Sequence, residues 1–319
     1  MTVVLCPGQG AQKVGMGRDL AERFPAARAT FERIDAALGV PLTRLMWEGP
    51  EDELTLTHNA QPAILAHSAA VLAVVGTQLG EVAAGAGHSL GEYSAWVAAG
   101  ALTAEAAATL VRKRGELMLD AGAKRPGTMA AVLGLPTAEV EAACAEASEG
   151  EEVAVAANLN APDQTVISGD PAAVMRASEG CKARGAKRVL PLKVSGAFHS
   201  PLMASAATGL GESLRSTRFA DARCPIVANV SAAPVQGADG VRDSLERQLL
   251  GAVRWEDSMR ALLAAGADGF VELGAGKVLR GLLRTIAKDA ASWNVEDPDS
   301  LQATLAALRP QAQPAEGRA

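Results

Sequence analysis

The sequence predicts an α/β fold, in which helices cover the faces of a sheet, and three observations support this prediction. Hydrophobic residues make up 49% of the 319 residues and aromatic residues only 3%, which favours helices packed on a sheet over an aromatic-rich all-β fold. An apolar run at residues 81–86 leads through a glycine-flanked turn into a helical pattern. Residues 128–192 alternate between strand and helix patterns. We therefore expect a large α/β subdomain, with a short parallel sheet and flanking helices, and a smaller inserted subdomain.

The first elements are predicted by apolar spacing and by the residues that bound them. Thr2–Cys6 is a β-branched and apolar run that stops at the turn PGQG, which indicates a buried strand. Helical patterns follow over residues 17–38 and 62–79, and Pro62 suits the first position of a helix. A further helix is expected over residues 103–121, with Thr103 as its amino-terminal cap.

The turn at residues 87–91, GHSLG, has the pattern G-x-S-x-G of a nucleophile elbow. Such a turn holds a serine hydroxyl away from the backbone, and its glycines allow chains to approach closely. Ser89 is therefore a candidate nucleophile, and the N–H of Leu90 at the helix start can stabilise a developing oxyanion. The alternative interpretation is an ordinary glycine-rich turn with a capping serine.

The remaining elements suggest how the chain is divided. Between residues 128 and 192 the predicted order is strand, helix, strand, strand, helix, strand, which is the order of the ferredoxin-like arrangement. Two more strands are expected at residues 225–230 and 269–273, and helices at 244–250 and 255–265.

We expect three parts in the chain. Residues 1–126 and 194–308 would form a large α/β-hydrolase-like catalytic subdomain, and residues 127–193 a ferredoxin-like small subdomain. Residues 309–319, which combine Pro, Gln and Gly, would be a disordered tail.

Composition and charge exclude several classes of function. The formal net charge is -6 and no Lys/Arg run stands out, which argues against general nucleic-acid binding. The amino terminus lacks a charged segment followed by a long apolar one, and no stretch has the length of a membrane span, so we expect a soluble, cytoplasmic protein. The four cysteines have no C-x-x-C spacing and the four histidines no H-E-x-x-H pattern, so we predict reduced thiols and no metal site.

A serine nucleophile needs a general base, and the histidines leave few choices. His88 precedes Ser89, but adjacent residues at a tight turn usually point apart. His199 lies in a glycine-containing loop and is the better candidate, whereas His67, on the apolar face of a predicted helix, is expected to be an interior histidine. No acidic residue before His199 stands out as a candidate for the third member of a catalytic triad, so we expect another group to orient His199.

Five motifs together carry a family resemblance. They are PGQGAQ at residues 7–12, GHSLGEYSA at 87–95, RKRG at 112–115, GAFHS at 196–200 and QL-x-x-x-VRW at 248–255. In their order and spacing they resemble the malonyl-CoA:acyl carrier protein transacylases, over nearly the whole chain. The length resembles the discrete enzyme of dissociated fatty acid synthesis.

The resemblance implies a role for each matching residue of the reaction centre. Ser89 would attack the thioester of malonyl-CoA and then release malonyl to the phosphopantetheine thiol of holo-acyl carrier protein, and His199 would act as the base. The backbone N–H groups of Gln9 and Leu90 would form the oxyanion hole. The main-chain carbonyl of Gln248 would hold the imidazole, which would explain the missing acid.

Substrate contacts follow from the same resemblance. Arg114 would grip the free malonyl carboxylate, a task suited to a planar guanidinium; an arbitrary arginine on a helix would instead be a solvated charge. His88 and Phe198 would also contact substrate. A phenyl ring at Phe198 leaves little room for a 2-methyl branch, so we expect a preference for malonyl over methylmalonyl of about 1–3 kcal/mol. The family's usual aromatic before PGQG is replaced by Cys6, and Trp96 is bulky where many relatives are smaller.

The implied partners are malonyl-CoA and the acyl carrier protein, with no cofactor, no nucleic acid and no membrane, and the protein is expected to be a monomer. The malonyl group would serve fatty acid synthesis, or alternatively a polyketide synthase carrier. Two other functions stay open at this point. A serine hydrolase would send the acyl group to water, and a catalytically silent scaffold would only bind carrier protein.

Overall fold

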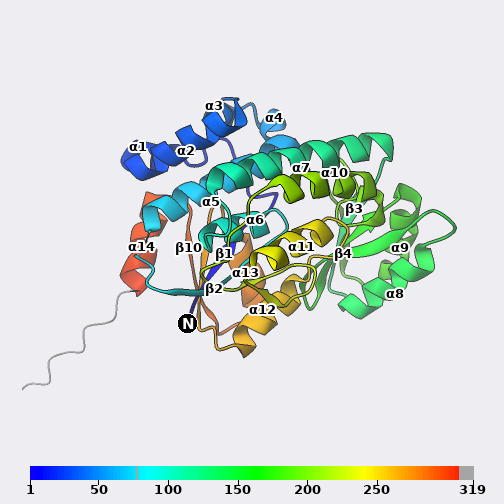
Figure 1. Cartoon of the computed structure of the whole chain (residues 1–319). Coiled ribbons are helices and arrows are strands. Elements are labelled where there is room, and N and C mark those ends of the chain that lie inside the picture. Colours follow the sequence, from blue (N-terminus) through cyan, green and yellow to red (C-terminus); the bar gives the residue numbers. More distant parts are fainter. Residues whose placement is uncertain (77, 309–319) are drawn as a thin grey trace, which may run out of the picture.

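The computed structural model describes residues 1–76 and 78–308. The tail expected to be disordered, residues 309–319, lies outside the described residues. Within these ranges the strands form a six-stranded sheet and a four-stranded sheet. Figure 1 shows the larger sheet in the middle of the molecule and the smaller one at its side.

The six-stranded sheet has the strand order β10-β9-β1-β2-β7-β8. All neighbouring pairs are parallel except β7 and β8, which are antiparallel. The strands are β1 (Thr2–Cys6), β2 (Val82–Gly87), β7 (Ile226–Val227), β8 (Pro234–Val235), β9 (Gly269–Leu273) and β10 (Ala291–Val295). Because parallel strands end at the same edge, the loops that follow β1, β2, β7 and β9 gather there, where α/β folds build their sites.

The central strand β1 is apolar throughout because both of its faces are covered. Val3 and Leu5 belong to one apolar core, and Val4 and Cys6 belong to the core on the other side. Side chains alternate between the faces of a strand, so burial on both sides requires a continuous apolar run. This is the pattern from which the sequence predicts the strand.

Helices cover both faces of this sheet. Figure 1 shows α5 (Thr57–Val75) and α7 (Ala104–Lys124) side by side above it, and α12 (Trp255–Ala264) and α13 (Val278–Ile286) below. The helix that follows the elbow, α6 (Gly91–Ala98), packs between the sheet and the upper pair. The other helices are α1 (Arg18–Arg23), α2 (Pro25–Leu38), α3 (Leu42–Glu48), α4 (Glu51–Thr55), α10 (Ala204–Ser216), α11 (Ala238–Gln248) and α14 (Pro298–Leu308), with a 3₁₀ turn at Pro201–Met203.

The four-stranded sheet is antiparallel, in the order β4-β5-β3-β6. Its elements are β3 (Thr128–Leu133), α8 (Thr137–Ala147), β4 (Ala154–Ala161), β5 (Gln164–Gly169), α9 (Pro171–Ala183) and β6 (Arg188–Pro191). The two helices share one apolar core with one face of this sheet. We propose that residues 127–193 form a ferredoxin-like subdomain, and that residues 1–126 and 194–308 form an α/β-hydrolase-like one.

A backbone connection joins the smaller sheet to the larger subdomain. Leu159 of β4 donates its N–H to the carbonyl of Val253 at 2.9 Å, and the N–H of Val253 donates to the carbonyl of Ala157 at 2.8 Å. This short parallel bridge joins the smaller sheet to the segment that precedes α12.

Four predicted element boundaries are wrong, two of them because of proline. The helix expected over residues 244–250 begins six residues earlier, as α11 (Ala238–Gln248). The helix expected over residues 17–38 is two helices, since Phe24 is extended (φ -125°, ψ 112°) and the residue before a proline, here Pro25, disfavours the helical conformation. Pro62 does not begin α5, which starts at Thr57 and carries Pro62 inside. The strand expected over residues 225–230 pairs only at Ile226–Val227. Strand β10 and helices α3, α4, α13 and α14 were not predicted.

The helix tolerates Pro62 because its missing hydrogen bond is replaced. Proline has no N–H to offer the carbonyl one turn earlier, which here belongs to His58. That carbonyl instead accepts a hydrogen bond from Arg112 Nη1 at 3.1 Å, from the neighbouring helix α7.

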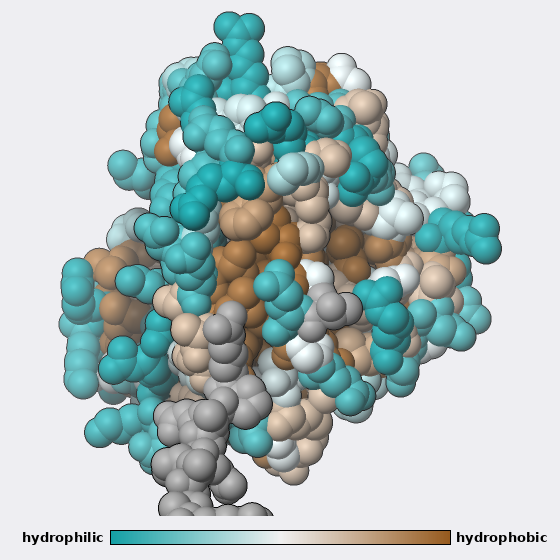
Figure 2. Space-filling view, turned by 90° about the vertical axis from the view of Figure 1, so that its left-hand side faces the viewer, coloured by the Kyte–Doolittle hydropathy of each residue, from teal (hydrophilic) through white to brown (hydrophobic). Residues whose placement is uncertain are grey.

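The side of the molecule that carries α1 and α14 has an apolar hollow with polar rims, as Figure 2 shows. A cavity of about 340 Å³ on this side is lined by Phe24, Val74, Leu301 and Leu305, among others. The carboxyl-terminal helix α14 thus packs on β10 and α1 without closing the hollow. No helix of the described residues is long and apolar enough to cross a membrane.

The turn between β2 and α6 is built by backbone contact. A Cβ at Gly87 would lie 1.9 Å from the carbonyl oxygen of Gly91, and a Cβ at Gly91 would lie 2.1 Å from the carbonyl oxygen of Cys6. Neither distance is compatible with a side chain. The glycines therefore set how closely β1, β2 and α6 can approach.

This close backbone contact predicts that one methyl group added at Gly91 greatly lowers the stability of the protein. We expect Gly91→Ala to lower the free energy of unfolding by about 3 kcal/mol, because backbone on both sides must move. The matched control is Gly281→Ala in the exposed face of α13, where a Cβ would meet nothing within 4 Å. There, alanine should raise stability by about 0.5–1 kcal/mol. Thermal melting compares the two variants, and a Gly91→Ala variant as stable as wild type would contradict this account of the turn.

Candidate active site

The structure brings Ser89 and His199 together. Ser89 lies in the turn between β2 and α6 with a left-handed backbone (φ 51°), and its Oγ is 2.7 Å from His199 Nε2. His199 comes from the loop after β6, is 3% exposed and also has a positive φ of 56°. Two residues 110 positions apart thus form the nucleophile and base arrangement expected from their chemistry.

Backbone carbonyls fix the protonation of the His199 ring. Nδ1 lies 3.1 Å from the carbonyl oxygen of Gln248 and 3.1 Å from that of Gly251. A carbonyl can only accept, so Nδ1 carries the proton and Nε2 presents a lone pair to the Ser89 hydroxyl. Burial, followed by the positive charge of Arg114, lowers the pKa of His199 to about 3. The imidazole is therefore a neutral base and needs no carboxylate to orient it.

Arg114 places a buried cation against the nucleophile. It projects from α7, is 1% exposed, and donates from Nη2 to Ser89 Oγ at 3.0 Å and to Gln248 Oε1 at 3.2 Å. Its Nη1 donates to Gln61 Oε1 at 2.7 Å. Within the described residues it forms no ion pair, so every acceptor that it meets is neutral. A buried guanidinium with neutral partners is suited to bind an anionic group of a ligand.

Two backbone N–H groups beside Ser89 are free to bind an oxyanion. The N–H of Ser89 itself is occupied, since it donates to Asn229 Oδ1 at 2.8 Å. In the described part of the chain, the N–H groups of Gln9 and Leu90 have no hydrogen-bond partner, and both residues line the cavity at Ser89. Leu90 is the residue before α6, where the helix dipole adds positive potential.

The cavity at Ser89 has a volume of about 280 Å³, and the remaining residues predicted to contact substrate, His88 and Phe198, line it. Phe198, Met118 and Met129 supply apolar wall, and Lys193 is an exposed cation on its lining. His88 also lines it, but its Nε2 lies 2.8 Å from Asn160 Oδ1, whereas the ring nitrogen at Ser89 Oγ is that of His199. His88 is thus a wall residue and not the partner of the nucleophile.

Four residues of this site were not predicted from the sequence: Gln61, Glu92, Asn160 and Asn229. Asn229 follows the short strand β7 at the carboxyl edge of the sheet, and a polar residue directly after an apolar run there is the signal that could have found it. Gln61 is a buried polar residue within the apolar helix α5. His67, in contrast, is interior as expected: its Nε2 contacts the Glu296 carbonyl at 2.9 Å, and burial lowers its pKa to about 4.

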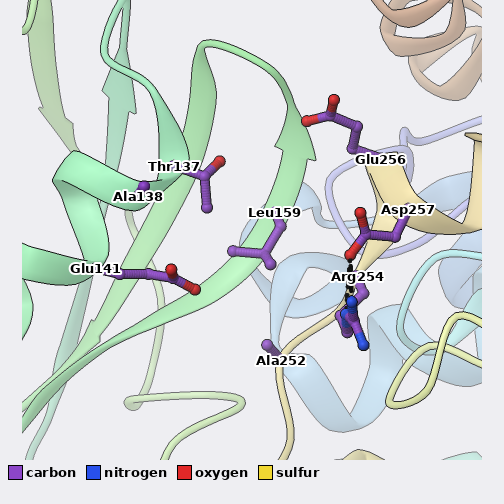
Figure 3. A pocket seen from close by; sticks show the side chains of 8 residues that line it. All are labelled: Thr137, Ala138, Glu141, Leu159, Ala252, Arg254, Glu256 and Asp257. Carbon is purple, nitrogen blue, oxygen red and sulfur yellow. Dashed lines mark hydrogen bonds and ion pairs between the residues drawn. The ribbon is translucent and has the colours of Figure 1, made fainter.

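A second cavity, of about 450 Å³, lies between α8, β4 and the start of α12 (Figure 3). Leu159 faces this cavity while its neighbour Asn158 faces the cavity at Ser89, as alternation along β4 requires. Arg254 and Asp257 on its wall pair with each other at 2.7 Å. None of the predicted site residues lines it. Among the described residues, no three His, Cys, Asp or Glu side chains cluster as metal ligands.

Comparisons with known proteins agree over nearly the whole chain. Residues 3–306 match the model of the acyl transferase domain. The malonyl CoA-acyl carrier protein transacylase of Bacillus subtilis is 43% identical over 305 residues, which are 96% of this chain and 96% of that protein.

Solved structures give the same result. MCAT from Streptococcus pneumoniae is 43% identical, covers 96% of this chain and 100% of its own, and has a TM-score of 0.91. A malonyl-transacylase solved in complex with its type II PKS acyl-carrier protein is 39% identical, with coverages of 96% and 99% and a TM-score of 0.91.

The low pKa of His199 predicts a flat pH profile for the reactivity of Ser89. A base with a pKa near 3 stays neutral as the pH falls from 7.5 to 5.5, whereas an ordinary histidine would lose about tenfold of its neutral form. We expect the rate of Ser89 modification by phenylmethylsulfonyl fluoride, corrected for hydrolysis of the reagent, to be unchanged over this range. A roughly tenfold loss at pH 5.5 in a folded protein would show that His199 titrates normally.

Proposed function

The chain belongs to the acyl transferase family and, within it, to the malonyl CoA-acyl carrier protein transacylases, and on this premise we propose how its site works. It transfers malonyl from malonyl-CoA to the phosphopantetheine thiol of acyl carrier protein through a malonyl-serine intermediate. The observation that carries the proposal is the contact of Ser89 Oγ with both His199 Nε2 at 2.7 Å and Arg114 Nη2 at 3.0 Å. It combines a nucleophile, a neutral base and a cation for the malonyl carboxylate.

The first half-reaction acylates Ser89. Its Oγ attacks the thioester carbonyl carbon while the hydroxyl proton moves to His199 Nε2. The tetrahedral oxyanion is bound by the N–H groups of Gln9 and Leu90. Collapse breaks the C–S bond, and His199 returns its proton to the leaving thiolate of CoA.

The second half-reaction runs the same steps with a different thiol. The phosphopantetheine thiol gives its proton to His199 and attacks the Ser89 ester. The ester C–O bond then breaks, Ser89 Oγ recovers the proton from His199, and malonyl leaves on the carrier protein. The backbone carbonyls of Gln248 and Gly251 keep Nδ1 protonated in both halves.

Arg114 selects the acyl group. Nη2 has to exchange its contact with Ser89 Oγ for the substrate carboxylate, since the same nitrogen lies at the nucleophile in the free enzyme. That exchange frees the hydroxyl for attack and replaces a neutral acceptor by an anionic one, a stronger hydrogen bond. Phe198 on the cavity wall limits space for a branch at the 2-position.

The product, malonyl-acyl carrier protein, serves fatty acid synthesis. The enzyme acts as a monomer in the cytoplasm. One finding favours a second destination: the relative solved with its type II PKS acyl-carrier protein is as similar in fold as the others. A polyketide carrier is therefore the second candidate acceptor, and the chemistry at Ser89 is the same for both.

Intact mass after brief mixing with malonyl-CoA tests the proposal. Wild-type protein should gain one malonyl group and lose it on addition of holo-acyl carrier protein, which gains the same mass. Ser89→Ala should gain nothing, and its transfer rate should fall by at least about 10³-fold. An adduct that is lost to water without carrier would indicate a hydrolase, and malonyl transfer by Ser89→Ala at the wild-type rate would refute the mechanism.

A further inference from the structure

Glu92 is a fully buried carboxylate beside the reaction centre to which none of the steps above gives a role. It is the second residue of α6 and is 0% exposed. Within the described residues it forms no ion pair with Lys, Arg or His. Burying a charge without such a partner is costly, so its hydrogen bonds should show what it stabilises.

Two distant segments converge on one oxygen of this carboxylate. Glu92 Oε2 accepts the backbone N–H of Asn229 at 3.0 Å and Gln248 Nε2 at 2.8 Å. The first contact supports the elbow, because the Asn229 side chain also holds Ser89 N and the Gly87 carbonyl. The second contact connects Glu92 to Gln248, whose side chain also contacts Arg114.

The side-chain amide of Gln248 has a fixed polarity in this arrangement. Its Nε2 donates to Glu92 Oε2 and to the Ser89 carbonyl at 2.9 Å, which leaves Oε1 to accept from Arg114 Nη2 at 3.2 Å. If the amide turned over, its NH₂ group would face the guanidinium, and two donors would meet. In its ionised form, Glu92 is a stronger acceptor than the neutral Ser89 carbonyl and opposes that inversion more strongly.

Charge gives Glu92 a second connection to Arg114. All hydrogen-bond acceptors of the guanidinium are neutral. Burial lowers the pKa of Arg114, and Tyr93 and then Glu92 oppose that shift. Burial also raises the pKa of Glu92, which the hydrogen bonds from Gln248 and from the N–H of Asn229, and the charge of Arg114, oppose. Removing the negative charge would weaken both the relay through Gln248 and the electrostatic support of the cation.

We propose that Glu92 is a positioning residue for acyl-group selectivity, which acts through the side-chain amide of Gln248 to hold Arg114 where it meets the malonyl carboxylate. The proposal rests on the proposed function, and it differs from a structural role in the elbow. Support of the elbow alone would affect every acyl donor equally. Positioning of Arg114 affects only the donor that carries a carboxylate.

The test compares malonyl-CoA with acetyl-CoA, which lacks the carboxylate, as donors to holo-acyl carrier protein. The Arg114→Ala variant, which lacks the guanidinium, serves as the reference for the largest expected loss of selectivity between the two donors. Glu92→Gln keeps the size and one acceptor oxygen but removes the charge; we expect kcat/KM for malonyl-CoA to fall at least about tenfold and that for acetyl-CoA to change by less than about threefold. Equal losses for both donors would overturn the proposal.

The matched control is Glu272→Gln, since Glu272 is also a buried carboxylate, 1% exposed, with two backbone donors. Its bonds go to the N–H groups of Leu279 and Arg280 at the start of α13 and to none of the site residues. Selectivity should stay within about twofold of wild type in this variant. A loss of selectivity equal to that of Glu92→Gln would make the effect a general one of buried carboxylates and overturn the proposal.

Gln248→Met separates the relay from the general base. This variant removes the side-chain amide but keeps the backbone carbonyl that orients His199. It also tests the relay if the Glu92→Gln variant does not fold. We expect the same loss of malonyl preference. Adding Glu92→Gln should cause a further loss that is smaller than its loss in the wild-type background, because the relay is already broken and only the direct field of Glu92 on Arg114 remains. Unchanged selectivity in Gln248→Met, or fully additive losses in the double variant, would refute the relay. A wild-type protein that fails to transfer malonyl would refute the proposed function instead.

Discussion

Close backbone packing at the elbow is the constraint on which the rest of the site depends. Gly8, Gly87 and Gly91 leave no room for a Cβ, so β1, β2 and α6 meet through their main chains. This closeness puts the N–H groups of Gln9, from the loop after β1, and of Leu90, at the start of α6, on the same cavity. Ser89 takes a left-handed conformation between them, and Asn229 ties down its N–H. The proposed oxyanion hole is therefore a property of the packing and needs no dedicated side chain.

Burial then determines the protonation state of His199. Because His199 is enclosed and lies beside Arg114, its neutral form is strongly favoured, and two backbone carbonyls are sufficient to orient it. Gln248 connects the parts: its carbonyl holds the base, and its side chain touches the Ser89 turn, Arg114 and Glu92. The same residue thus links His199, the proposed base, with Arg114, the proposed partner of the substrate carboxylate. A carboxylate in contact with His199 would raise its pKa and compete with the substrate for Arg114.

Much of this architecture could be predicted from local patterns, and the failures have physical causes. Two-sided burial made β1 a continuous apolar run and β9 apolar except for the buried Glu272, so their bounds agree with the prediction. Pro62 misled the prediction of α5 because Arg112, which replaces the lost hydrogen bond, belongs to another helix. Ser89, His199 and Arg114, which the structure brings into contact, could be named from the sequence because they stand in recognisable motifs. Glu92 also stands in a motif, but the role that we propose for it depends on Gln248, 156 positions away, and only the tertiary fold brings the two together.

The central claim is that one cavity offers Ser89 an oxyanion hole made of two backbone N–H groups and a cation for the substrate carboxylate. A crystal structure of the wild-type protein soaked with malonyl-CoA, with no acceptor thiol present, tests it most directly. The account predicts an ester on Ser89 whose carbonyl oxygen lies within hydrogen-bond distance of the N–H groups of Gln9 and Leu90, with the malonyl carboxylate on Arg114. An ester oxygen turned away from both N–H groups, or a carboxylate directed towards Lys193, would contradict it.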